Sequence, residues 1–165
     1  MSLKDVLESF LSEMGWEDEI SRDELHDELI IATGVTLGDQ GYRTYIQTHE
    51  QSQFIKIFMY CPFSVPIERM DVAPVVINRL NVDLPAGHIE MMGDGTVRYR
   101  HFVDVENATA SAALVQNMLA GACSTFTDDA RLKAIGALRF TSAPISVIIE
   151  EYEAAQSIKS GKGAH

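Results

Sequence analysis

Hydrophobic residues recur along the chain first at a helical spacing and then at a strand-like spacing, and this succession predicts the elements. A helical spacing opens the chain, and Gly15 ends it. Its apolar residues are Leu3, Leu7, Phe10, Leu11 and Met14. Three strand-like runs follow at residues 29–37, 42–49 and 54–61. The polar turns between these runs are short, which indicates an antiparallel meander.

The third run is the strongest strand, and it is apolar on both of its faces. Ile55, Ile57, Met59 and Cys61 share one face, while Phe54, Phe58 and Tyr60 share the other. Both faces therefore need cover. We expect a central strand, or a strand whose second face is covered by another subunit.

A helix and a hairpin are predicted over residues 71–105. The apolar stripe of the helix is Val72, Val76, Leu80 and Leu84. Because proline is tolerated in the first helical turn, Pro74 makes Asp71 a plausible N-cap; a helix that began near residue 67 would kink at Pro74. Strands at residues 88–92 and 96–105 are then joined by a Gly-Asp-Gly turn.

The remaining segments complete the predicted fold. Residues 109–139 are helical in pattern, with a second helix able to begin at Thr127-Asp128-Asp129, and residues 145–157 form a helix or alternatively a strand start. The charged residues 17–28 form a solvated loop or a short helix. The order α-β-β-β-α-β-β-α predicts a two-layer α+β fold with a five-stranded antiparallel sheet. We expect a single domain over residues 1–157 and a flexible tail at 158–165.

Composition narrows the classes of function. The 165 residues carry a formal net charge of −11, which repels phosphate backbones and anionic lipid, so we expect no nucleic-acid and no membrane partner. A basic or amphipathic polypeptide is a more natural partner, although the charge also simply keeps exposed apolar surface soluble. Cys61 and Cys123 have no second cysteine at metal or redox spacing. The N-terminus is acidic and amphipathic, unlike a signal peptide. Together with the unpaired cysteines, this indicates a cytoplasmic protein.

Candidate chemistry is sparse. His88, Glu90 and Asp94 could form a metal or acid–base cluster, but the turn itself explains Asp94, and a real site needs more ligands together. We expect no cofactor and no catalytic residue. Arg98 and Arg100 either receive an acidic ligand on an open sheet face or pair with Glu90 across the hairpin, and the second reading is preferred.

Several of these residues resemble the YbjN family of bacteria, whose members are described as sensory transduction regulators. The matching features are Trp16, Pro62 with Pro66, Asn78-Arg79-Leu80-Asn81, Gly87-His88, Asp94-Gly95 and Val97-Arg98-Tyr99-Arg100. Ile89, where the family often has an aromatic, and Pro74 depart from the pattern. The resemblance implies a fold similar to the type III secretion chaperones, which are commonly dimeric and hold a partner polypeptide. It supplies no catalytic residues.

We therefore expect a non-enzymatic regulatory protein that binds a polypeptide partner or itself, as a homodimer, in a chaperone-like manner. The expected partner-binding residues are Phe54, Phe58, Tyr60, Arg98 and Arg100. The alternative is a small-molecule-binding domain or an uncharacterised enzyme with a pocket between helices and sheet.

Overall fold

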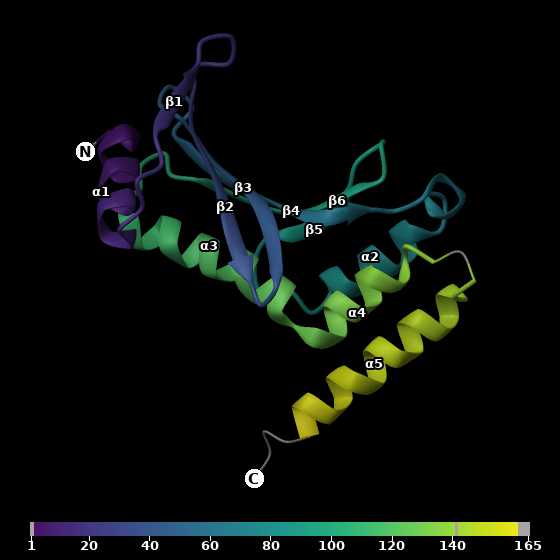
Figure 1. Cartoon of the computed structure of the whole chain (residues 1–165). Coiled ribbons are helices and arrows are strands. Elements are labelled where there is room, and N and C mark those ends of the chain that lie inside the picture. The colour runs from purple at the N-terminus through teal and green to yellow at the C-terminus, as the bar shows by residue number, and fades with distance from the viewer. Residues whose placement is uncertain (1, 141, 162–165) are drawn as a thin grey trace.

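A computed structural model describes residues 2–140 and 142–161, and in this part of the chain six antiparallel strands form one twisted sheet (Figure 1). The order across the sheet is β1-β2-β3-β4-β6-β5. The strands are β1 (Ile20–Asp23), β2 (Glu28–Leu37), β3 (Gln40–His49), β4 (Phe54–Ser64), β5 (His88–Met91) and β6 (Thr96–Asp104). The predicted meander and hairpin are confirmed, and β4 is a central strand, as predicted, although no helix of the described residues covers its second apolar face.

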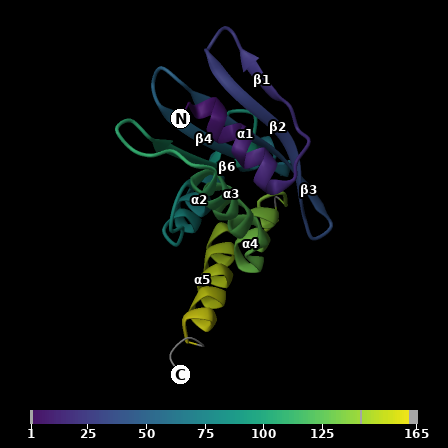
Figure 2. The same ribbon diagram turned by 90° about the vertical axis from the view of Figure 1, so that its left-hand side faces the viewer.

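The helices gather on one side of the sheet (Figures 1 and 2). They are α1 (Leu3–Met14), the 3-10 turn η1 (Ile67–Arg69), α2 (Ala73–Asn81), α3 (Ala112–Thr127), α4 (Asp129–Ala137) and α5 (Ile145–Gly161). Helix α3 packs against α1 and against strands β2, β4 and β6, while α2 packs beside β5. Helix α5 lies farthest from the sheet and packs on α4 and α2. The architecture is therefore α+β with an antiparallel sheet, as predicted, while α5 lies outside the helices that cover the sheet.

The core lies between the sheet and the helices. Alternate strand residues point into it, and the fully buried ones include Ile31, Tyr42, Ile46, Ile57 and Tyr99. Helices supply the opposite wall with residues such as Phe10, Leu80, Val115 and Phe126. The period of two along each strand thus sends every second side chain away from the core, to a face that no helix of the described residues covers.

Polar caps explain where several helices begin. Ser2 and Asp5 form a reciprocal capping box at α1, and Gly15 ends that helix at a φ of 66°. Ser111 caps α3, and the side chain of Asp128 caps α4 by accepting a hydrogen bond from the Arg131 amide. The predicted break near Thr127 is therefore confirmed, because Asp128 has extended backbone between the two helices.

Three predictions about elements were wrong. The sheet has six strands rather than five, because Ile20–Asp23 in the charged segment pairs with β2. The element order accordingly differs from the prediction. Helix α2 begins at Ala73 with Val72 as an uncapped N-cap, so Asp71 is not the cap; Pro74 lies in the first turn as expected. The prediction of a C-terminal helix is confirmed over the strand alternative, and the helix continues to Gly161, past the predicted end at residue 157. Residues 162–165 of the predicted tail lie outside the described residues.

Candidate functional site

All five predicted binding residues lie on the helix-free face of the sheet. Strand register places Phe58 beside Arg100 and Tyr60 beside Arg98 on the neighbouring strand, with Phe54 four residues before Phe58 on β4. We call this surface the open face. It consists of the outward residues of β3 to β6: Arg43, Tyr45, Gln47, His49, Phe54, Lys56, Phe58, Tyr60, His88, Glu90, Arg98, Arg100, Phe102 and Asp104.

The centre of the open face is a fixed arrangement around Arg98. Its guanidinium lies 4.3 Å from the ring centre of Phe58, which leaves that phenylalanine only 8% exposed although no helix covers it. Arg98 Nη1 donates to the Tyr60 hydroxyl at 2.7 Å, and its Nε donates to Glu90 Oε1 at 2.6 Å. Three side chains from three strands are therefore locked together, which gives the surface a rigid floor.

Glu90 is a single carboxylate beside two arginines and a histidine. Besides Arg98, the Nε2 of His88 lies 3.4 Å from Glu90 Oε2, and Arg100 Nη1 lies 3.8 Å from the same oxygen. Burial alone would raise the pKa of Glu90, but the hydrogen bond and charge of Arg98, aided by His88 and Arg100, outweigh it and hold that pKa below the ordinary value. The predicted pairing of both arginines with Glu90 is present, tight for Arg98 and loose for Arg100.

Aromatic rings continue the open face toward the ends of β4 and β6. Phe54 stacks on His49 at 5.2 Å and meets Phe102 at 5.4 Å between ring centres. Lys56 lies over the Phe54 ring and pairs with Glu28 at 2.8 Å. Phe102 remains 46% exposed, so an apolar ring stands available to solvent. Sequence reasoning omitted Phe102, although its place in the alternation with Arg98 and Arg100 could have found it.

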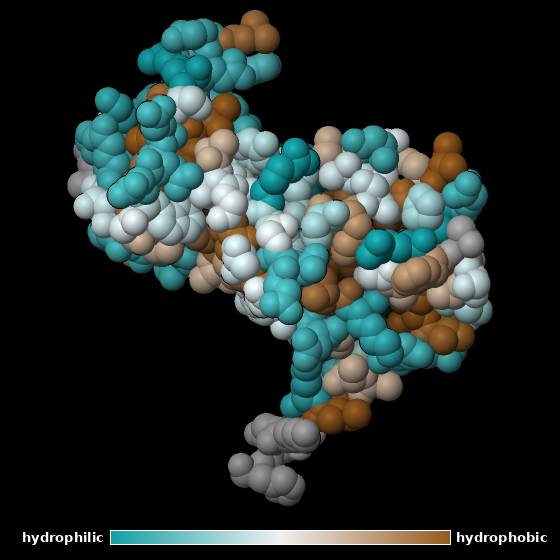
Figure 3. Space-filling model, in the orientation of Figure 1, coloured by the Kyte–Doolittle hydropathy of each residue, from teal (hydrophilic) through white to brown (hydrophobic). Residues whose placement is uncertain are grey.

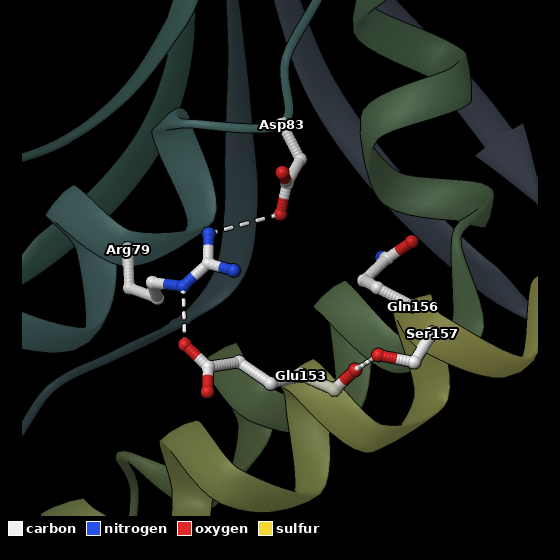
Figure 4. Close-up of a pocket in the computed structure, with 5 residues that line it drawn as sticks. All are labelled: Arg79, Asp83, Glu153, Gln156 and Ser157. Carbon is white, nitrogen blue, oxygen red and sulfur yellow. Dashed lines mark hydrogen bonds and ion pairs between the residues drawn. The ribbon is translucent and has the colours of Figure 1, made fainter. Parts of the chain in front are cut away.

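A second candidate is a polar hollow of about 510 Å³ between α2 and α5, lined by Arg79, Asp83, Glu153, Gln156 and Ser157 (Figure 4). Its volume would admit a small molecule. Its charges, however, already satisfy one another: Arg79 donates to Glu153 at 2.6 Å and to Asp83 at 3.1 Å. The hydrogen bond to Glu153 and the nearby Asp83 raise the pKa of Arg79. The charged residues of the hollow therefore link α5 to α2 and are already paired with one another.

The imagined cluster of His88, Glu90 and Asp94 is not assembled. Asp94 accepts a hydrogen bond from the Thr96 amide at 2.9 Å inside its own turn. Within residues 2–140 and 142–161, no group of three or more His, Cys, Asp or Glu side chains could hold a metal ion. None of the helices in the described ranges is both long and apolar enough to cross a membrane.

In the view of Figure 3, hydrophilic residues predominate over the end of the β1–β2 hairpin. Hydrophobic residues gather elsewhere in that view as separate patches, with polar residues between them. No continuous apolar area is visible from this side, so the mixed aromatic and cationic open face is the more informative surface.

Comparison with known proteins places the chain in a family. The model of the YbjN family, described as "Putative bacterial sensory transduction regulator", matches residues 3–131. The chain belongs to the YbjN family. The match ends inside α4, so α5 of this YbjN protein lies beyond it.

Two solved structures are similar in outline to this YbjN protein. One is YbjN from E. coli, with 11% identity, a TM-score of 0.48 and 92% of each chain covered. The other is a chain of the HopA1–SchA chaperone–effector complex, with 11% identity, a TM-score of 0.47, and 83% of this chain and 92% of that chain covered. Among curated proteins, none matches the sequence.

Proposed function

We propose that this YbjN protein is a non-enzymatic interaction protein that docks a partner polypeptide on the open face of its sheet. The observation that carries the proposal is the convergence of Phe54, Phe58, Tyr60, Arg98 and Arg100 on one helix-free surface. Aromatic and arginine side chains are the types enriched where proteins bind one another.

The rigidity of this surface supports the same function. Arg98, held by Glu90 and Tyr60, fixes the positions of its neighbours before any partner arrives, so little side-chain entropy is lost on binding. The exposed ring of Phe102 beside Phe54 offers an apolar anchor. The paired charges between α2 and α5 favour neither a ligand pocket nor a catalytic group there.

A test is selection of random 12-residue peptides displayed on phage against the full-length protein. We expect enriched peptides whose affinity falls about tenfold or more on Phe102→Ala, because the exposed aromatic anchor of the open face is lost. Phe58→Asp should abolish binding as well. Circular dichroism checks that both variants fold. Since Phe58 is nearly buried, Phe102→Ala is the variant that keeps the test informative if Phe58→Asp unfolds.

The matched control is Val82→Ala, which removes an exposed apolar side chain on the helix side of the molecule. It should leave peptide affinity unchanged. Enriched peptides whose affinity is unchanged by both Phe102→Ala and Phe58→Asp would contradict the proposal. A native mass of twice 18.3 kDa that falls to 18.3 kDa in Phe58→Asp would assign the open face to a second copy instead of a separate partner.

A further inference from the structure

We infer that the open face selects acidic polypeptide segments, and this inference rests on the proposed function. The chain as a whole is strongly anionic, with a net charge of −11. The open face departs from that balance: on strands β3 to β6 it carries the cations Arg43, Lys56, Arg98 and Arg100 against the carboxylates Glu90 and Asp104, with Glu28 of β2 beside Lys56 at its border. An anionic molecule with one cationic face attracts negative partners to that face and repels them elsewhere.

Two of the four cations are already satisfied within the protein. Lys56 pairs with Glu28 at 2.8 Å, and Arg98 pairs with Glu90 at 2.6 Å. Breaking these pairs would leave partly buried charges without partners, which is costly. Lys56 and Arg98 therefore shape the surface, and recognition of a partner falls to the two remaining arginines.

Arg43 and Arg100 can still bind an anion. Arg43 is exposed beside the Tyr60 ring, and among the described residues no carboxylate lies within 4.0 Å of it. Arg100 reaches only Glu90, at 3.8 Å, whose carboxylate is already held by Arg98. The Nε of Arg100 is buried and makes no hydrogen bond to any described residue. The Arg100 side chain as a whole is nevertheless 38% exposed, so the accessible part of its guanidinium can donate to an incoming carboxylate.

The positions of the two arginines suit a short segment. Arg43 pairs with Tyr60, and Arg100 pairs with Phe58, so the arginines stand on opposite sides of β4 and two residues apart along it. From the spacing of strands and residues, their Cα atoms lie roughly 12 Å apart. One extended peptide with two carboxylates about four residues apart spans that distance, and its apolar side chains then lie over the aromatic floor.

Nucleic acid fits this surface less well than an acidic peptide. Binding of single strands relies on aromatic faces free for bases to stack. Here the Phe58 ring is covered by Arg98, and the Tyr60 ring is flanked by Arg43, Arg98 and Tyr45. The net charge of the chain would also oppose a phosphate backbone along its length.

The experiment sequences the 12-residue peptides that the full-length protein enriches from the random library. We expect Asp and Glu to be at least twice as frequent in them as in the unselected library. The double variant Arg43→Gln/Arg100→Gln should bind the enriched peptides about tenfold or more weakly than the wild-type protein does. Raising the salt concentration should also lower the affinity of the wild-type protein for these peptides. The control Arg22→Gln/Lys133→Gln loses the same charge at exposed pairs off the open face and should leave affinity unchanged.

The possible failures separate the inference from the proposed function. The inference of an acidic partner would be wrong if the peptides lose affinity on Phe102→Ala but are not acidic, or if their affinity is unchanged in Arg43→Gln/Arg100→Gln. The proposal of a docking face would still stand. Absence of any peptide that depends on Phe102 would overturn both. A labelled 12-nucleotide thymidine strand serves as the second probe. If the protein binds this strand more tightly than the peptides, and the arginine double variant does not bind it, the inference would be overturned in favour of nucleic acid.

Discussion

Two glycines of the family motifs are required by close packing and by backbone conformation. Gly87 has a φ of 65°, and a Cβ there would overlap the ring and hydroxyl of Tyr99. That hydroxyl donates to the Ala86 carbonyl at 3.1 Å, and burial raises the pKa of Tyr99 to about 12. Gly95 has a φ of 81° and packs its Cα against the Val65 carbonyl. Both glycines therefore hold the β5–β6 hairpin against neighbouring chain.

Gly87→Ala tests this reading of the motif. We expect a loss of about 2–4 kcal/mol in the free energy of unfolding, since the left-handed backbone and the overlap with Tyr99 both oppose a methyl group. Urea denaturation measures the loss. The control is Gly38→Ala, where φ is 58° but nothing lies within 4 Å, so only the backbone cost of about 1–2 kcal/mol remains. Equal losses in the two variants would show that the Tyr99 contact is unimportant.

At the scale of elements, sequence reasoning succeeded where a local pattern decides the structure. Strands β2 to β6 follow from alternation and short turns, and the α3–α4 break follows from capping by Asp128. Strand β1 did not follow, because Ile20, Ser21, Arg22 and Asp23 carry a charged, weakly apolar pattern and are extended through pairing with β2. The start of α2 was also missed, because Val72 begins it without any polar cap.

Asn81 connects two elements through the backbone of an edge strand. Its amide nitrogen donates to the Ile89 carbonyl at 2.9 Å, and its oxygen accepts from the Ile89 amide at 2.7 Å. The side chain thus takes the place of a further strand beside β5 and satisfies backbone groups that would otherwise be open to edge-to-edge pairing.

Asn81→Ala should destabilise the protein by about 2 kcal/mol, because two hydrogen bonds to partly buried backbone groups are lost together. Hydrogen exchange of the Ile89 amide should become faster, while the amides of β3 and β4 should exchange as before. Asn78→Ala, on the exposed side of the same helix, is the control and should cost close to nothing. Unchanged exchange at Ile89 in Asn81→Ala would refute the role of the side chain as an edge cap.

For the whole molecule, the open face was more predictable than the arrangement of the helices. A period of two places Phe54, Phe58 and Tyr60 together, and it places Arg98 and Arg100 together; register then joins the two groups. The contribution of Arg43 depends on the pairing of β3 with β4, which no pattern in β3 reveals. The docking of α5 depends on contacts such as Arg79 with Glu153, which are 74 residues apart in sequence.

Helix α5 buries only two of its described apolar residues against the rest of the molecule. Tyr152 is 2% exposed and its hydroxyl donates to Asp83 at 3.0 Å, while Ile148 is the other fully covered apolar residue of the helix. The helix packs on α4 and α2 rather than on the sheet, and it lies beyond the part of the chain that the family model matches. Its attachment should therefore be a local equilibrium that opens without unfolding the sheet.

Tyr152→Ala measures that equilibrium. Truncating a buried aromatic residue costs about 3–5 kcal/mol when the whole fold depends on it. Here we expect a smaller loss of global stability, because α5 detaches first and limits the cost. In hydrogen exchange, the amides of α5 should lose protection while those of β3 and β4 keep theirs. The control Glu151→Ala removes only an exposed pair with Lys133 and should change neither. If β3 and β4 lose protection together with α5, the helix belongs to one cooperative unit with the sheet, and its docking is a condition of the fold.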